Sequence, residues 1–213
     1  MALQLHSFFR SSASFRVRIA LALKGLEYDY VPVHLVRREQ LAPGFAALSP
    51  GRLVPVLQDG DLTLTQSMAI IEYLDERYPQ PPLLPADALG RARVRAIAQH
   101  IACEIHPLDN LRVLSYLVRE MKVGEDDKNR WYRHWVETGL EAVERALAGP
   151  STGRFCHADA PGLADCVLVP QIFNAQRMDC RLDHVPTVMR VFEACMQLPA
   201  FDRAQPSACP DAA

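Results

Sequence analysis

The sequence predicts a small α/β domain followed by an all-α domain. Strand-like and helix-like segments alternate over the first eighty residues, whereas strand signals almost vanish beyond residues 79–90, PQPPLLPADALG. The four prolines of that stretch indicate a linker. A chain of 213 residues is long enough for two modest domains. The predicted boundaries are 1–80 for the α/β domain, 81–90 for the linker and 91–213 for the helical domain.

Each element of the first domain follows from a local pattern. Leu3 and Leu5 alternate with polar neighbours, as in a strand with one buried face. An almost wholly apolar run ends at Gly25, as helices commonly do. The predicted elements are strand 3–8, helix 14–24, strand 28–35, two strands in residues 52–67 around the turn Asp59-Gly60, and helix 68–78.

The second domain reads as helices throughout. An apolar stripe with helical spacing predicts that one face of helix 127–148 is buried; its members are Val136, Leu140, Val143 and Leu147. The other predicted helices are 88–121, 163–177 and 186–197. The tail that follows them, QPSACPDAA, is expected to be loose.

Composition excludes several function classes. A formal net charge of -2 is unlike the basic balance of proteins that bind the phosphate backbone, so no nucleic-acid partner is expected. No apolar run is long enough for a membrane helix, and no membrane association is expected. The six cysteines form no C-x-x-C pair, which favours reduced thiols in a cytoplasmic protein. His100, Cys103 and His106 lack a fourth ligand nearby, so no metal site is predicted.

Three short stretches could carry chemistry. In RSSASFRVRIALALKG, Ser11, Ser12 or Ser14 could cap a helix whose N-terminus suits an anion such as a thiolate. In LVPVL, a cis Val54-Pro55 bond would turn the backbone of Val54 toward a bound peptide. In LTQSMAIIEYL, Gln66 and a helix-capping Ser67 would form a carboxylate receptor. Taken singly, each stretch could equally be an ordinary cap or an edge strand.

Together and in this order, these stretches resemble the zeta class of the glutathione transferases, which includes the maleylacetoacetate isomerases. The double serine before R-V-R-I-A-L is the most specific element, and IHPLDNLRVL and ADCVLVPQIFNAQR are also similar to the zeta pattern. The resemblance extends over essentially the whole chain. It implies the glutathione transferase fold, a thioredoxin-like N-terminal domain plus an all-α C-terminal domain, and it implies a homodimer.

The resemblance also implies that glutathione is the cofactor. The residues that would bind it are Ser11 and Ser12 at the sulfur, Gln40 at the glycyl end, Val54 with Pro55 at the cysteinyl unit, Gln66 and Ser67 at the γ-glutamyl carboxylate, and His106 and Asn110 from the helical domain. Ala13 replaces the family's usual cysteine, so a mechanism that needs a protein thiol there is in doubt. Gly162 replaces its usual Ser/Thr helix cap.

The implied reaction is cis–trans isomerisation of a maleyl β-keto acid. A thiolate would add to the alkene, the resulting single bond would rotate, and elimination would leave the trans isomer. A small dicarboxylate substrate calls for arginine, and Arg10, Arg112 and Arg177 match family positions. Arg10 and Arg177 join Ser11 and Ser12 as the catalytic candidates, and His106 is a further substrate contact. Arg16 and Arg18 are expected to be structural, in ion pairs at a domain or subunit boundary.

The leading interpretation is maleylacetoacetate isomerase activity in tyrosine and phenylalanine breakdown. The alternative within the same chemistry is maleylpyruvate isomerisation in gentisate or salicylate breakdown. A zeta-class transferase that acts on small α-haloacids is a third possibility. A hypothesis from another class of function is a non-catalytic binding module with the transferase fold. The presence of the serine pair and of Gln66-Ser67 argues against it.

Overall fold

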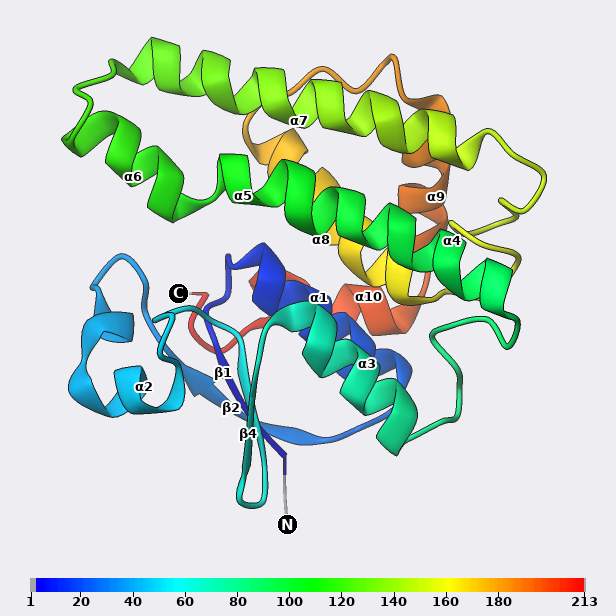
Figure 1. The fold of residues 1–213 in the computed structure, drawn as a ribbon, viewed down its shortest axis with the longest axis horizontal. Helices are drawn as coiled ribbons and strands as arrows, with labels where there is room; N and C mark the ends of the chain where they lie inside the picture. The colour runs from blue at the N-terminus through cyan, green and yellow to red at the C-terminus, as the bar shows by residue number, and fades with distance from the viewer. Residues whose placement is uncertain (1–2, 213) are drawn as a thin grey trace. The chain divides into compact units, whose positions relative to one another are not determined.

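The computed structural model describes residues 3–212, which fold into two compact units. The first unit combines the residues up to Leu83 with those from Met196 onward, and the second runs from Leu84 to Cys195. Figure 1 follows the chain through both. The division after Leu83 falls in the proline-rich stretch. The sequence-based boundaries assigned residues 91–213 to one helical domain, whereas the last residues group here with the sheet.

The first unit is built on a mixed four-stranded sheet in the order β2-β1-β3-β4. Its strands are β1 (Leu3–Ser7), β2 (Tyr28–Pro32), β3 (Val56–Asp59) and β4 (Leu62–Thr65). β1 pairs with β2 in parallel and with β3 antiparallel, so that Leu5 lies opposite Tyr30 on one side and Leu57 on the other. The β3–β4 hairpin turns at Gly60, whose positive φ of 59° suits glycine.

The described part of the first unit also contains six helical segments. They are α1 (Ser12–Leu23), the short helix η1 (Glu39–Leu41), α2 (Pro43–Leu48), α3 (Ser67–Arg77), α10 (Pro199–Arg203) and η3 (Pro206–Ala208). α1 packs against both α3 and α10, which explains why it is apolar almost all round (Figure 1). As predicted, α1 ends before Gly25, which adopts φ 65°.

Two local details of the first unit differ from the sequence-based prediction. The strand predicted within residues 52–57 begins only at Val56, because Pro55 has no N–H to donate to a ladder. The predicted cis Val54-Pro55 bond is confirmed. Ser67 was predicted to cap α3; instead Gln66 is the cap residue and Ser67 is the first residue of the helix.

The second unit is all helical. Its helices are α4 (Ala88–Gln99), the π-helix η2 (His100–Ile105), α5 (His106–Asp109), α6 (Leu111–Arg119), α7 (Glu125–Leu147), α8 (Leu163–Arg177) and α9 (Pro186–Met196). The predicted stripe of α7 is confirmed: its four apolar residues are at most 1% exposed. α4 packs against α8, and α7 packs against η2, α5 and α6.

The prediction of one helix over 88–121 is wrong. Asn110 adopts an extended backbone with ψ 159° and starts α6 as its N-cap. The Asn110 Oδ1 accepts hydrogen bonds from the backbone N–H groups of Arg112 and Val113 at 3.0 and 3.1 Å. Such a cap competes with helix continuation. Pro107, which lacks an N–H, lies in the preceding turn.

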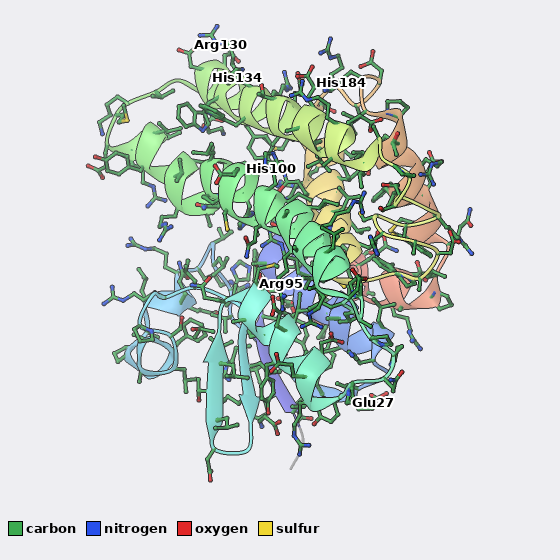
Figure 2. The ribbon with its side chains drawn as sticks, turned by 45° about the vertical axis from the view of Figure 1, so that its right-hand side comes forward. Glu27, Arg95, His100, Arg130, His134 and His184 are labelled. Carbon is green, nitrogen blue, oxygen red and sulfur yellow. The ribbon has the colours of Figure 1, made fainter. Side chains whose placement is uncertain are left out.

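A glycine lets η2 approach α7 closely. A Cβ placed at Gly139 would lie 2.4 Å from Cγ1 of Ile105, which is far inside van der Waals contact. The Nε2 atom of His100 lies 3.2 Å from the Gly139 carbonyl oxygen and joins the same two elements (Figure 2). The close packing of η2 therefore depends on the missing side chain at residue 139.

The expectation of a loose tail is also wrong. Beyond α10 the chain forms η3, and Asp211 hydrogen-bonds both to Phe9 and to Tyr30. The sequence could not indicate this, since a short polar segment shows no periodicity and its partners lie about two hundred residues away.

Arg18 was expected to be a structural residue in an ion pair, but its hydrogen bonds go to neutral acceptors. Arg16 lies nearby in the same helix. Both are only 2% exposed, within the first unit. The Arg18 guanidinium donates to the carbonyl oxygens of Phe9 and Ala204 and to the Ser7 hydroxyl, at 2.9 to 3.2 Å. Its three bonds tie β1, the following loop and α10 together. Burial lowers the pKa of Arg18 from its ordinary range.

Candidate functional site

The start of α1 carries a partly exposed serine hydroxyl. Ser11 is the N-cap residue, and its Oγ accepts the backbone N–H of Ser14 at 3.2 Å. This decides between the three capping candidates of the sequence. A hydroxyl that accepts in this way keeps its own proton for a further hydrogen bond. Ser12 is buried, with 5% of its surface exposed. Ser11 is therefore the better placed of the pair to donate to an anion at the helix N-terminus.

The loop before α1 holds Arg10 against two aromatic rings. The Arg10 guanidinium lies 5.1 Å from the ring centroid of Phe9 and 5.8 Å from that of Phe8. The Ser11 N–H donates to the Phe8 carbonyl oxygen at 2.9 Å. Arg10 is exposed, so its charged end can meet a ligand while cation–π contacts support it.

The start of α3 forms a second anion-binding environment. Gln66 has a positive φ of 69° and supplies no side-chain cap. The N–H groups of the first turn, which have no partner within the helix, therefore receive no hydrogen bond from the cap residue's side chain. The Ser67 hydroxyl lies there, 6% exposed, and accepts from Nη1 of the buried Arg16 at 3.3 Å. A helix N-terminus backed by a buried cation favours a carboxylate.

Two more candidates of the first unit lie on other segments. Val54 is 8% exposed and directly precedes β3, so its peptide groups lie outside the strand ladder. Gln40 lies in η1, and its Oε1 atom is buried without a hydrogen-bond partner among residues 3–212. A buried amide oxygen of this kind is normally satisfied by a ligand or by water.

In the second unit, His106 lies beside a buried carboxylate. The Nδ1 atom of His106 lies 3.5 Å from Oδ1 of Asp109. The other oxygen of Asp109 accepts from Nε2 of Gln171, on α8, at 2.7 Å. Asp109 is 4% exposed, whereas the His106 side chain is 22% exposed.

The remaining candidates of the second unit surround this histidine in sequence or in space. The amide of Asn110 caps α6 and also donates to the Pro107 carbonyl oxygen at 3.0 Å, which leaves one amide hydrogen for a ligand. Arg112 is exposed in the first turn of α6, and Arg177 is exposed at the end of α8. Burial and the Asp109 charge raise the pKa of Tyr132, and the Arg177 charge opposes them, which places Arg177 near this cluster.

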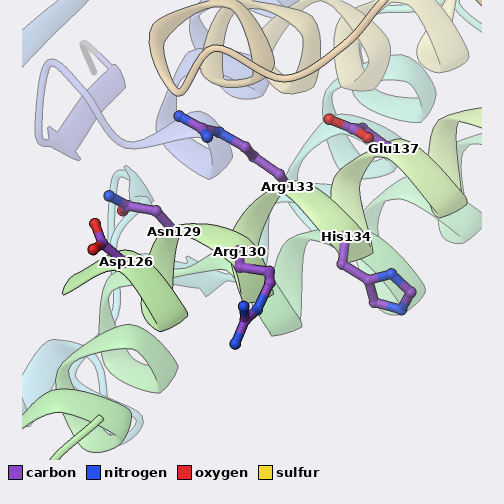
Figure 3. Close-up of a pocket in the computed structure, with 6 residues that line it drawn as sticks. All are labelled: Asp126, Asn129, Arg130, Arg133, His134 and Glu137. Atoms are coloured by element: carbon purple, nitrogen blue, oxygen red, sulfur yellow. The ribbon is translucent and has the colours of Figure 1, made fainter. Parts of the chain in front are cut away.

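A surface groove of about 560 Å³ has none of these candidates in its lining. Its lining residues come from α7 alone: Asp126, Asn129, Arg130, Arg133, His134 and Glu137 (Figure 3). Charges of both signs line it, Arg130 pairs with Asp127, and Arg133 donates to the Met178 carbonyl oxygen. The arginines that could bind an anion are thus already engaged or flanked by carboxylates. The groove therefore has neither the purely positive lining that would favour an anion nor the purely negative lining that would favour a cation.

Among residues 3–212, no three His, Cys, Asp or Glu side chains are grouped as a metal ion would require. No helix in the described part of the chain is both long and apolar enough to cross a membrane.

Known proteins resemble this chain over its whole length. The glutathione S-transferase N-terminal domain family matches residues 1–76. A maleylpyruvate isomerase from Ralstonia sp. is 48% identical over 212 residues, which cover 99% of this chain and 100% of that protein. A probable maleylacetoacetate isomerase from Vibrio cholerae is 46% identical, and the match covers 100% of this chain and 99% of that protein. The chain belongs to the zeta-class glutathione transferase family.

Solved structures of the zeta class agree with this fold. A holo maleylpyruvate isomerase superposes with a TM-score of 0.96 at 48% identity, covering 99% of this chain and 100% of that one. Maleylacetoacetate isomerase from Anaeromyxobacter dehalogenans, with glutathione in its active site, superposes with a TM-score of 0.90 at 46% identity. The match covers 100% of this chain and 98% of that one. Another structure of that protein contains dicarboxyethyl glutathione and citrate. It superposes with a TM-score of 0.89 at 46% identity and with the same coverage of the two chains.

The structure shows contacts around the candidates of this zeta-class chain that the sequence did not predict. Arg16 donates to Ser67, Asp109 lies beside His106 and accepts from Gln171, and Asp211 accepts from the loop before α1. A charged residue inside an apolar helix is a weak hint for Arg16. Nothing local marks Asp211, because its contacts exist only after the tail has folded back.

Proposed function

We propose that this zeta-class chain is a glutathione-dependent cis–trans isomerase of a maleyl β-keto acid, with maleylacetoacetate as its substrate. The observation that carries the proposal is the Ser11 hydroxyl, which caps α1 and keeps a proton to donate at the positive end of that helix. The support from relatives is the full-length identity to maleylpyruvate and maleylacetoacetate isomerases.

Glutathione fits the residues of the first unit. Its thiol would take the hydrogen of Ser11, with Ser12 behind it, and its γ-glutamyl carboxylate would take the N–H groups at Gln66 and Ser67. The unpartnered amide oxygen of Gln40 and the backbone of Val54 beside Pro55 supply further donors and acceptors for a peptide. When bound, glutathione supplies a nucleophilic sulfur and is regenerated in each turnover.

The task of the α1 N-terminus is electrostatic. The helix dipole and the Ser11 hydroxyl both favour an anionic sulfur over a neutral one, so together they lower the pH at which it ionises. Ala13 leaves no protein thiol next to the serines, and the nucleophile must therefore be the cofactor's.

The task of the arginines is to bind the substrate's carboxylates. Arg10, Arg112 and Arg177 are exposed, and a guanidinium binds a carboxylate through two parallel hydrogen bonds. Arg10 and Arg177 act on the reacting end, where negative charge develops on the keto oxygen. His106, which lies beside Asp109, and Asn110 contribute hydrogen bonds from the second unit. Alanine at Arg10 or Arg177 should reduce kcat/KM for the dicarboxylate while leaving glutathione binding intact.

Maleylpyruvate is the second candidate substrate. It is favoured by the 48% identity to the Ralstonia maleylpyruvate isomerase and by the TM-score of 0.96 to a structure of that name. The two substrates share the maleyl-keto unit, so the same arginines would serve either one.

We also propose that the protein is a cytoplasmic homodimer. All six cysteines are free, as expected in a reducing compartment. Each unit exposes large apolar side chains, among them Leu62 at 53% and Leu89 at 82%, which suits a surface covered by a second copy. Light scattering of the purified protein would give the mass of one chain or two.

The deciding experiment follows the isomerisation of maleylacetoacetate and of maleylpyruvate by absorbance, each with and without glutathione. Glutathione-dependent turnover of maleylacetoacetate with the higher kcat/KM is the expected result. A clear preference for maleylpyruvate would replace the substrate and keep the chemistry. No glutathione-dependent turnover of either would refute the isomerase, and activity on α-haloacids would then be assayed.

A further inference from the structure

The carboxylate of Asp211 joins the C-terminal segment to two distant parts of the first unit. Its Oδ1 accepts the hydroxyl of Tyr30, on β2, at 2.6 Å. Its Oδ2 accepts the backbone N–H of Phe9, in the loop between β1 and α1, at 3.1 Å. Hydrogen bonds to a carboxylate are roughly twice as strong as neutral ones. One side chain thus fixes the tail, the edge strand and the loop relative to each other.

Phe9 is held on both of its backbone polar groups. While Asp211 takes its N–H, its carbonyl oxygen accepts from Nη2 of Arg18 at 3.0 Å. Arg18 itself is anchored to the carbonyl oxygen of Ala204, in the segment that also carries Asp211. The C-terminal segment therefore acts on Phe9 twice, directly through Asp211 and indirectly through the Arg18 anchor.

The loop that is clamped in this way carries the proposed chemistry. Arg10 follows Phe9 directly and rests its guanidinium on the Phe9 ring. Ser11 comes next and caps α1. The backbone of residues 8–11 forms a single turn closed by the hydrogen bond from the Ser11 N–H to the Phe8 carbonyl oxygen. A shift of Phe9 must therefore move both Arg10 and Ser11.

We propose that Asp211 is a positioning residue for the glutathione thiolate: by holding the Phe9 N–H, it sets the placement of the Ser11 hydroxyl and of Arg10. This role rests on the function proposed above. Displacement of a reacting or stabilising group by about 1 Å can reduce a rate roughly a hundredfold, so a tail residue outside the site can matter this much. The tail then contributes to catalysis without touching substrate.

The two arms of Asp211 can be tested separately. Asp211→Ala removes both arms, and Asp211→Asn keeps the size but weakens both. Tyr30→Phe removes only the arm to β2 and leaves the carboxylate on Phe9. Asp202→Ala is the matched control, because Asp202 lies in the same segment and its carboxylate accepts from the Gln205 side chain. All variants are compared as full-length chains below their unfolding temperatures.

The readouts are the ultraviolet absorbance of bound glutathione thiolate against pH, kcat and KM for glutathione, and amide hydrogen exchange at Phe9. For Asp211→Ala we expect the thiolate titration to move up by about one pH unit and kcat to fall roughly ten- to a hundredfold. Asp211→Asn should show a smaller shift in the same direction and faster exchange at Phe9. Tyr30→Phe and Asp202→Ala should keep the thiolate titration of the natural protein.

Several outcomes would overturn the positioning role. One is an unchanged thiolate titration in Asp211→Ala or, where that variant does not fold, in Asp211→Asn. Another is an equal shift in Tyr30→Phe, which would indicate general loosening of the tail. The thiolate titration needs no maleyl substrate, so it separates this proposal from the isomerase. A natural protein that binds glutathione without isomerising either substrate refutes only the reaction, whereas one that binds no glutathione refutes both.

Discussion

The Nη1 atom of Arg16 lies 3.3 Å from the Ser67 hydroxyl oxygen, in a buried position that joins the middle of α1 to the first residue of α3. The hydroxyl accepts from the guanidinium, so its own proton is free to point toward an anion at the start of α3. A buried positive charge therefore lies behind the proposed carboxylate-binding site at the start of α3, where the sequence indicated only Gln66 and Ser67.

Replacing Arg16 should weaken the binding of glutathione. Hydrogen bonds to charged groups contribute about 1.5–3 kcal/mol, so Arg16→Gln should raise the Kd of glutathione roughly ten- to a hundredfold. Because the thiol is bound elsewhere, kcat at saturating glutathione should change little. Calorimetric titration measures the Kd. Arg203→Gln, at an exposed arginine of the same unit, is the control. An unchanged Kd in Arg16→Gln would mean that this cation does not act on the carboxylate.

The two serines before α1 should differ in their contribution to activity. Ser11→Ala removes the hydroxyl that can donate to the sulfur, and kcat should fall roughly ten- to a hundredfold, in keeping with one lost charge-assisted hydrogen bond. It should also lower the free energy of unfolding by about 1 kcal/mol, because the cap of α1 is lost. Ser12→Ala, at the buried neighbour, should retain most of the activity. Equal losses of kcat in the two variants would contradict the assignment of Ser11.

A buried lysine should be important for the stability of the first unit. The Lys24 ammonium donates to the Asp75 carboxylate at 2.5 Å and to the carbonyl oxygens of Tyr78 and Pro81 at 2.7 and 2.6 Å. Lys24→Met leaves the Asp75 carboxylate, only 11% exposed, without its cation. We expect a loss of about 3–5 kcal/mol in the free energy of unfolding, measured by denaturant titration. Lys122→Met, at an exposed lysine, should be near neutral, and a similar result for Lys24→Met would refute the argument.

Stability should fall in alkaline solution partly because of Cys180. Burial raises the pKa of this thiol from its ordinary value of 9.0 to about 12. Above pH 9 the unfolded thiol loses its proton while the native thiol keeps it, so the unfolded state binds fewer protons and the free energy of unfolding decreases as pH rises. At pH 10 the cost is about 1.4 kcal/mol.

The test compares Cys180→Ala with Cys103→Ala, at an exposed thiol. The free energy of unfolding of Cys180→Ala should fall less steeply between pH 9 and about 11 than that of the natural protein, where each unit of pH costs up to about 1.4 kcal/mol for this group. The buried thiols of Cys156 and Cys195, whose pKa burial also raises, should leave part of the slope. Parallel slopes for Cys180→Ala and the natural protein would contradict the assignment.

The sequence by itself predicted the fold class, the strands and two longer helices of the first domain, and the candidate residues of the proposed site. Local patterns were sufficient because they reflect local physics: alternation for β1, Gly25 at the end of α1, a proline before β3 and an apolar stripe on α7. The motifs around Ser11 and Ser67 are likewise contiguous, since each site uses the start of one helix.

Only the tertiary structure decided which of these residues work together. The break at Asn110 results from a side chain that competes with the helix backbone. Arg16 at Ser67 joins residues 51 positions apart, and Asp211 at Phe9 joins residues 202 positions apart. Such pairs are formed when buried charges must find partners in the folded chain, a requirement that leaves no periodic trace in the sequence.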